Sequence, residues 1–133
     1  AAKQPPSLLC WSDRPLARGG DKTVYHGVFK DRPVAIAVAK PGHAKRLLDE
    51  IQILRELGSH PNIVELLHCS DAMSKDTYIV LEKVNWDLDR LVNQHTFAGQ
   101  SLPTALTVHV IRQVSCGLTY MHNKGIIHRD LKL

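Results

Sequence analysis

The sequence predicts an α+β fold in which an antiparallel sheet carrying one helix comes first and a mainly helical part follows. Short runs of β-branched and aromatic residues, separated by turn signals, fill most of the first half of the chain. Apolar residues at helical spacing occur once in that half and dominate the second half. The chain has 133 residues, 44% of them hydrophobic, which is enough for one compact domain.

Five segments are expected to be strands, because each is rich in β-branched or apolar residues and is bounded by turn signals. They cover residues 11–17, 23–29, 34–39, 63–69 and 77–83. The turns Gly19-Gly20-Asp21 and Lys30-Asp31-Arg32-Pro33 separate the first three strands. A polar loop at residues 70–76 joins the last two.

One helix is predicted between the third and fourth strands. Leu47, Ile51 and Leu54 recur at i, i+4 and i+7, so one apolar stripe runs along residues 43–57. Gly58 is expected to end this helix.

Two further helices are predicted after the strands. Asp87 is a suitable N-cap for a short helix through Asn93. Pro103 opens a long helix to about Asn123, because proline is tolerated in the first turn, and Gly125 ends it. Helical spacing along the long helix is kept by Ile111, Val114, Leu118 and Met121.

Composition excludes several functional classes. The net charge of +4 comes from scattered residues with no run of five like charges, which argues against a dedicated nucleic-acid arm. Three cysteines without a Cys-x-x-Cys pair argue against a disulfide framework and favour a reducing, cytoplasmic setting. The longest apolar run, residues 34–39, is too short to span a bilayer, and no His or Cys pair has zinc-ligand spacing.

The end of the sequence carries its most informative motif. Ile126-Ile127, which we expect to form a short buried strand, is followed directly by His128-Arg129-Asp130 and then Leu131-Lys132. Charges so close to a buried segment are costly unless they are paired or functional. The string resembles the catalytic-loop signature of the protein kinases, in which the aspartate accepts the proton of the substrate hydroxyl.

The resemblance to protein kinases extends from about Asp13 to the end of the chain, with several motifs in the expected order. It implies a leader or linker at 1–12, a kinase small lobe and hinge at 13–84, and the start of the large lobe at 85–133. Kinase domains are about twice this length or more. We therefore expect a domain truncated in the catalytic loop, with its magnesium-binding asparagine and Asp-Phe-Gly motif beyond Leu133 and no metal ligand before it.

The glycine-rich loop matches the family only in part. The pattern Gly-x-Gly-x-x-Gly-x-Val corresponds to Ala17, Gly19, Lys22 and Val24, so only Gly19 is kept as glycine. Asp21 stands where the family usually has an aromatic residue. Taken alone, this segment is better interpreted as an ordinary hairpin turn.

The phosphate-binding lysine of the third strand is absent. The family motif Val-Ala-Ile-Lys is Val34-Ala35-Ile36-Ala37 here, and Ala37 supplies neither charge nor hydrogen bond. One interpretation is a pseudokinase. The other is that Lys22 replaces the missing lysine, an arrangement that resembles the with-no-lysine kinases.

The relocation hypothesis depends on strand geometry. Side chains alternate along a strand, so Lys22 and Val24 should point to one face, toward the nucleotide. Lys40 is three residues from Ala37 and should face the opposite side. The alternative for Lys22 is a solvated loop lysine, since lysine is common on surfaces.

Further ATP contacts follow from the resemblance. Glu50 matches the helix glutamate that pairs with the phosphate-binding lysine; alternatively it is a surface residue paired with Arg46 at i, i+4. Leu81 would be the gatekeeper. The remaining expected nucleotide contacts are the adenine cover Ala35, the hinge residues Glu82 and Val84, and Asp87 at the ribose.

The catalytic loop supplies the remaining roles. Asp130 would be the base, Lys132 would contact the γ-phosphate and Arg129 would pair with a phosphorylated activation loop, while His128 would be a structural link. The resemblance therefore implies a protein serine/threonine kinase whose partners are ATP, Mg²⁺ and a protein substrate. The alternative is a nucleotide-binding or scaffolding pseudokinase.

Overall fold

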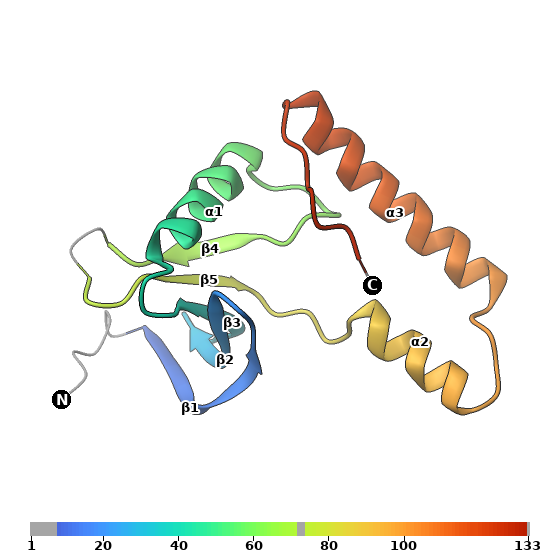
Figure 1. Cartoon of the computed structure of the whole chain (residues 1–133), viewed down its shortest axis with the longest axis horizontal. Coiled ribbons are helices and arrows are strands. Elements are labelled where there is room, and N and C mark those ends of the chain that lie inside the picture. Colours follow the sequence, from blue (N-terminus) through green and yellow to red (C-terminus); the bar gives the residue numbers. More distant parts are fainter. Residues whose placement is uncertain (1–7, 72–73, 133) are drawn as a thin grey trace. The chain divides into compact units, whose positions relative to one another are not determined.

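The computed structural model describes residues 8–71 and 74–132, which form two compact units. One unit contains the described residues up to Gly58 together with Val64–Lys83, and the other contains Ser59–Ile63 and the residues from Val84 onward. The first unit carries the sheet and helix α1, and the second carries helices α2 and α3 (Figure 1).

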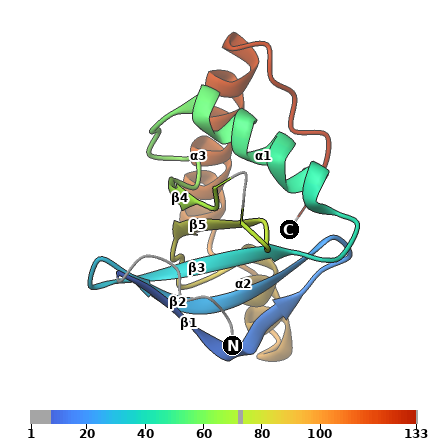
Figure 2. The same cartoon turned by 90° about the vertical axis from the view of Figure 1, so that its left-hand side faces the viewer.

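The first unit is built on a five-stranded antiparallel sheet with the order β1-β2-β3-β5-β4. Its strands are β1 (Leu9–Arg18), β2 (Lys22–Phe29), β3 (Arg32–Ala39), β4 (Leu66–Cys69) and β5 (Tyr78–Glu82). Figure 2 shows α1 (Ala44–Leu57) crossing one side of this sheet. The predicted α+β class, with an antiparallel sheet, one helix and then further helices, is confirmed.

Both faces of the sheet bury apolar side chains, because strand residues alternate between them. On the face toward α1, Ala37 and Ile79 pack with Leu47 and Ile51 of the helix. The opposite face holds a second cluster, formed by Leu9, Phe29, Val34, Ile36, Tyr78 and Val80. The sheet is therefore fixed from both sides, and its register is strongly specified.

Strand β1 lies at one edge of the sheet, and its pairing with β2 is irregular. The register shifts on both sides of Pro15, as expected for a residue that has no N–H to give to a ladder. Gly27 of β2 pairs with Trp11 of β1 and with Val34 of β3. A Cβ atom there would clash with Ile36 Cδ1 and would lie 2.7 Å from the Cys10 carbonyl oxygen.

The second unit contains α2 (Leu88–Phe97) and α3 (Thr104–Asn123). Helix α2 begins at Asp87, whose Oδ1 accepts a hydrogen bond of 2.6 Å from the Arg90 N–H. Gly117 of α3 is buried, and a Cβ atom there would lie 3.0 Å from the carbonyl oxygen of Asn62. The ring of Tyr120 packs against the His60 ring in a tilted arrangement, at a centroid distance of 4.4 Å.

Some predicted bounds were wrong. Strand β4 begins at Leu66, because Ile63 closes a turn by donating its N–H to the His60 carbonyl. Helix α2 extends beyond Asn93, where the side chains of His95 and Thr96 bond the carbonyls four residues earlier. The first two strands and β3 start one to two residues earlier than expected.

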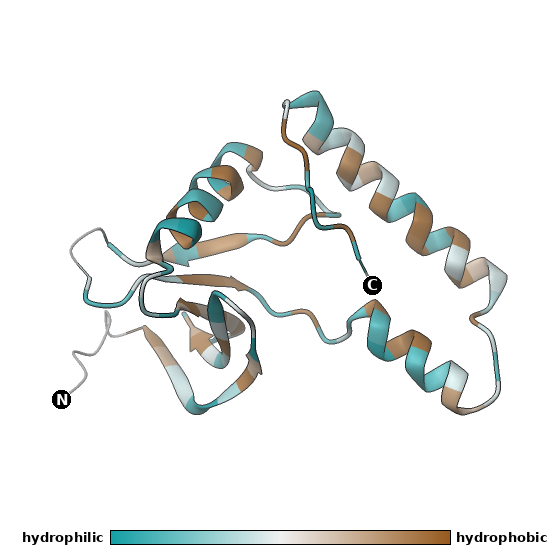
Figure 3. Cartoon of the chain, in the orientation of Figure 1, coloured by the Kyte–Doolittle hydropathy of each residue, from teal (hydrophilic) through white to brown (hydrophobic). Residues whose placement is uncertain are grey.

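The predicted buried strand at Ile126-Ile127 is wrong. These residues adopt no regular structure, and Ile127 is 65% exposed. A strand needs a neighbour for its backbone groups, and no described segment pairs with this one. Along α3, apolar residues recur (Figure 3), yet Ile111 and Val114 are exposed while Met121 is buried. No helix of the described residues is long and apolar enough to cross a membrane.

Candidate functional site

The site of the first unit centres on an ion pair between β2 and α1. The Lys22 ammonium lies 2.7 Å from both carboxylate oxygens of Glu50. The two side chains are 35% and 37% exposed, so the pair is partly shielded from water but open on one side. A phosphate group could therefore approach the ammonium without first displacing protein.

Local structure explains why these two residues meet. Leu47 and Ile51 are buried against the sheet, and Glu50 follows Leu47 by three residues, so it lies on the same side of α1. Lys22 begins β2, opposite Ala39 of β3. Its neighbour on the same face, Val24, packs in the cluster under α1.

Ala37 lies next to this ion pair but contributes no charge. It is 2% exposed and packs with Leu47, Ile51 and Ile79. Its cross-strand partner is Val24, one position along the face from Lys22. The residues at 37 and 22 therefore share a face of the sheet, and only Lys22 carries a cation.

The same face continues as an apolar surface. By register, Ala35 pairs with Leu81 of β5 and lies two residues from Ala37, so both share the face of Lys22 and Val24. The side chains of Val24, Ala35 and Leu81 are all half-buried. An apolar surface that ends in an ammonium group suits a ligand with an aromatic base and a polyphosphate, and ATP fits this description.

The β1–β2 loop precedes Lys22 and is held by the chain itself. The Gly19 N–H donates to the Lys22 carbonyl at 2.9 Å, and a Cβ atom on Gly19 would lie 3.3 Å from that oxygen. The Lys40 ammonium donates to the Gly19 carbonyl and does not join the Glu50 carboxylate. Backbone N–H groups of such a loop are suited to anions.

Arg46 does not bond Glu50, so the alternative of a local helix pair is wrong. The Arg46 guanidinium instead donates to Asp21 Oδ2 at 2.6 Å, and His43 Nδ1 lies 2.9 Å from Oδ1. The Arg46 hydrogen bond lowers the pKa of Asp21, and the charges of Arg46 and His43 add to this. Sequence reasoning missed this cluster; the only available signal was an acidic residue at the loop tip.

The last residue of β5 and the residues that follow the strand have different surroundings. Glu82 bonds the backbone of Glu65 twice, with its side chain accepting at 2.9 Å and its N–H donating at 3.1 Å. Val84 is exposed, at 66%. Asp87 is the N-cap of α2, as its sequence position predicted.

In the second unit the catalytic-loop motif forms a compact polar turn. The Asp130 N–H donates to His128 Nδ1 at 3.2 Å, and the Lys132 ammonium lies 3.1 Å from Asp130 Oδ2. Arg129 has a φ of 64°, in the left-handed region that costs a non-glycine residue about 1 kcal/mol. Such backbone strain is concentrated at functional sites. The motif residues belong to a different unit from Lys22 and Glu50.

No metal site is formed by the described residues. No group of three His, Cys, Asp or Glu side chains within residues 8–71 and 74–132 could hold a metal ion. The described residues therefore supply no donor set for Mg²⁺.

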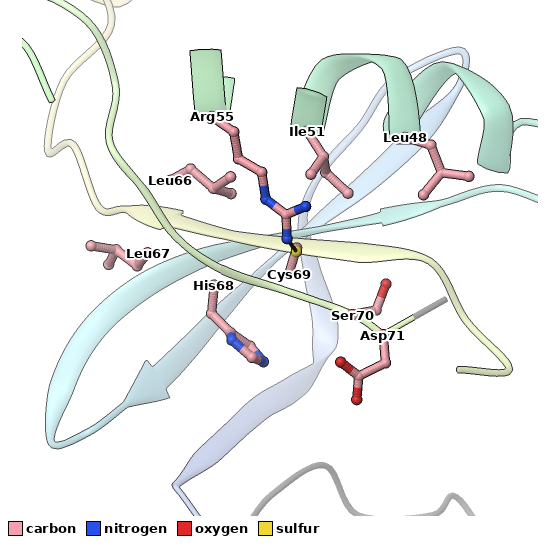
Figure 4. A pocket seen from close by; sticks show the side chains of 9 residues that line it. All are labelled: Leu48, Ile51, Arg55, Leu66, Leu67, His68, Cys69, Ser70 and Asp71. Carbon is pink, nitrogen blue, oxygen red and sulfur yellow. Dashed lines mark hydrogen bonds between the residues drawn. The ribbon is translucent and has the colours of Figure 1, made fainter. Parts of the chain in front are cut away.

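A groove of about 500 Å³ lies between α1 and β4, away from the expected site residues. Figure 4 shows Arg55 reaching from α1 to Cys69 of β4, and its Nη2 lies 3.0 Å from the Cys69 sulfur. Leu48, Ile51 and Leu66 contribute apolar lining. No motif in the sequence pointed to this groove.

Comparison with known proteins identifies the chain. The protein kinase domain matches residues 13–133. The chain belongs to the protein kinase family. This match confirms the protein kinase family that the sequence motifs predicted.

Individual relatives are also protein kinases. The chain is 35% identical over 124 residues to the leaf rust 10 disease-resistance locus receptor-like protein kinase-like 1.4 of Arabidopsis thaliana, covering 90% of this chain and 19% of the relative. It is 39% identical to the serine/threonine-protein kinase unc-51 of Caenorhabditis elegans, covering 88% and 14%. It is 34% identical to the mitogen-activated protein kinase mpkC of Emericella nidulans, covering 80% and 26%. The chain thus spans about a fifth of the length of the first relatives it matches.

Proposed function

We propose that the polypeptide carrying this kinase domain binds ATP and transfers its γ-phosphoryl group to serine or threonine hydroxyls of a protein, with Lys22 in place of the lysine missing at Ala37. The observation that carries the proposal is the contact of the Lys22 ammonium with both Glu50 carboxylate oxygens. Because the Glu50 carboxylate holds the Lys22 ammonium in place, this ammonium can neutralise phosphate charge without first moving. The relative named serine/threonine-protein kinase unc-51 supports this substrate class.

The other site residues take the following roles in this proposal. The leader or linker expected at 1–12 ends before Leu9, because β1 begins there and Leu9 is buried in the core of the sheet. The small lobe and hinge therefore extend from Leu9 to residue 84, and residues 85–133 begin the large lobe. Val24 and Ala35 cover the adenine, and the backbone at Glu82 and Val84 holds its edge. Asp87 adds a ribose contact in a conformation compatible with its cap.

In the transfer step, the substrate hydroxyl oxygen forms a bond to the γ-phosphorus, and the bond from the γ-phosphorus to the bridging oxygen breaks, releasing ADP. Asp130 accepts the hydroxyl proton, and Lys132 contacts the transferred group. Arg129 pairs with a phosphorylated segment of the same polypeptide. Mg²⁺ is a further partner of the reaction and neutralises phosphate charge when bound.

A cytoplasmic setting for the domain is part of the proposal. Cys10, Cys69 and Cys116 are all free thiols, as expected in a reducing compartment. One relative is named as a receptor-like protein kinase and another as a sensor for unfolded proteins in the ER. A cytoplasmic kinase domain that belongs to a larger, membrane-attached protein is consistent with these names.

The test is Lys22→Met in the full-length polypeptide, with transfer of labelled γ-phosphate to a serine/threonine peptide as the readout. We expect kcat to fall about a hundredfold or more, the effect typical of removing one electrostatic stabiliser of the transferred group. Lys45→Met is the matched control, because Lys45 is an exposed lysine on the same helix as Glu50. Unchanged transfer by Lys22→Met would show that the lysine has not been relocated.

A second variant asks whether the cation alone is required. Ala37 packs with Leu47 and Ile51, which flank Glu50 on α1. A lysine introduced at position 37 therefore starts beside the same carboxylate. We expect Ala37→Lys to recover at least part of the transfer lost in Lys22→Met.

A nucleotide-binding or scaffolding pseudokinase is the second candidate. It is favoured by Ala37 and by the retention of only Gly19 among the three loop glycines. Its signature would be a full-length polypeptide that binds a fluorescent ATP analogue yet transfers no phosphate, with Asp130→Asn indistinguishable from the natural sequence.

A further inference from the structure

Asp21, at the tip of the β1–β2 loop, is bound at both carboxylate oxygens by helix α1. Arg46 Nη1 donates to Oδ2 at 2.6 Å, and His43 Nδ1 lies 2.9 Å from Oδ1. One partner on each oxygen fixes the orientation of the carboxylate as well as its position. The Asp21 side chain is 40% exposed, so the contact lies at the surface but is not fully solvated.

The backbone around Asp21 is also tied down. The Lys40 N–H donates to the Asp21 carbonyl at 2.9 Å, and the His43 N–H donates to the Lys40 carbonyl at the same distance. The segment that joins β3 to α1 is therefore hydrogen bonded to the loop. Because Asp21 directly precedes Lys22, the anchor on Asp21 also limits where the Lys22 stem can begin.

The two side-chain contacts between loop and helix have opposite polarity. Asp21 meets Arg46, and Lys22 meets Glu50, one helical turn further along α1. If α1 slid by one turn, Asp21 would face Glu50, and two carboxylates would repel each other. The charge pattern therefore specifies one position of the helix along β2.

The pairing of Asp21 with Arg46 and His43 also compensates a negative charge close to the proposed phosphate site. A carboxylate at the tip of a phosphate-binding loop would repel ATP, since like charges close together are unfavourable. Because the Asp21 carboxylate pairs with Arg46 and His43, its negative charge is largely compensated by these two side chains.

We propose that Asp21 is a positioning residue that sets Lys22 against Glu50 for phosphate contact by anchoring the β1–β2 loop to the first turn of α1. This inference rests on the proposed function, since it assigns to Lys22 the phosphate contact. Asp21 itself touches neither the nucleotide nor the reacting atoms. Its effect passes through the position of the loop and of the Lys22 ammonium.

The test is a double-mutant cycle in the full-length polypeptide, with the KM for ATP, kcat and the dissociation constant of a fluorescent ATP analogue as readouts. Asp21→Asn and Arg46→Gln are each expected to raise the KM for ATP about threefold to tenfold, the range for loss of a charged, partly exposed hydrogen bond. The double variant is expected to be no worse than the poorer single one, because both remove the same contact.

Matched controls separate positioning from general destabilisation. Asp31→Asn removes a carboxylate from the turn between β2 and β3, where Asp31 has a φ of 61° that asparagine tolerates, and it should leave the KM unchanged. Asp21→Glu keeps the charge and should recover most of the affinity. Thermal midpoints of the Asp21 and Asp31 variants should both stay within a few degrees of the natural sequence, since both positions lie at the surface.

Two results would overturn the inference without touching the proposed function. The first is an unchanged KM in Asp21→Asn while Lys22→Met is inactive. The second is a double variant whose KM change equals the product of the two single changes, because independent sites behave in this way. Full activity of Lys22→Met would instead refute the proposed function, and this inference with it.

Discussion

Gly27 is the residue whose replacement tests the packing of the sheet most directly. A Cβ atom at this position would clash with Cδ1 of Ile36, which is fully buried, and would lie 2.7 Å from the Cys10 carbonyl oxygen. The Ile36 methyl has no free space to enter, and the carbonyl oxygen belongs to the backbone of β1. We therefore expect Gly27→Ala to separate β1 from β2 and β3 locally.

The magnitude follows from the cost of overpacking. One extra methyl group in a well-packed core costs about 1–3 kcal/mol, and we place Gly27→Ala near the upper end because one of its two contacts is backbone. Urea unfolding of the chain, followed by tryptophan fluorescence, measures this value. Gly20→Ala is the matched control, because a Cβ atom at Gly20 would have no neighbour within 4 Å. Equal stability of the two variants would refute the packing argument.

Three further predictions concern charges and a buried phenol. Glu50→Gln should lower phosphoryl transfer about tenfold to a hundredfold, because Lys22 loses its charged partner. The control Asp49→Asn, on the exposed side of α1, should have no effect. Equal effects of the two substitutions would contradict the pairing of Lys22 with Glu50. The folded-state pKa of Asp21 is lowered below 3.8, so its contribution to stability is present above that pH and is lost as the pH falls through the folded value. Acid unfolding should therefore be less steep below about pH 4 for Asp21→Asn than for the natural sequence, and identical acid curves would contradict this. Burial raises the pKa of Tyr78 above 10.0, so the stability it contributes is present below pH 10 and is lost as the pH rises through the folded value. Tyr78→Phe should remove part of the alkaline unfolding measured by circular dichroism, and an unchanged alkaline limb would show that other groups cause it.

Most of the fold could be predicted because each element carries its own pattern. Leu47 and Ile51 recur with helical period, and both are buried in α1. The alternation of β3 is equally local: Val34 and Ile36 belong to one core cluster and Ala37 to the other. The same period of two places Lys22 and Val24 on one face, which the register with Ala39 and Ala37 bears out.

The errors arose where structure depends on partners distant in the sequence. Ile126-Ile127 is apolar enough for a strand, but a strand also needs a neighbour, which no pattern within the pair can supply. The contact of Asp21 with Arg46 joins residues 25 positions apart. It depends on how α1 lies against the sheet, so opposite charge alone could not select it from the many other possible pairs.

The proposed placement of the lysine on β2 instead of β3 is compatible with the small side chains that adjoin Lys22. Lys22 lies directly opposite Ala39, and Ala37 is its diagonal neighbour on the same face. Cross-strand neighbours have Cβ atoms about 5 Å apart, so a larger residue at either position would compete with the lysine stem for the space toward α1. Ala37 fills its place under Leu47 and Ile51 with a methyl group alone, and the stem of Lys22 reaches Glu50 from the neighbouring strand. Under the proposed function, the uncharged Ala37 and the charged Lys22 are one coupled feature of this sheet, because Lys22 is the cation that Glu50 binds at this face.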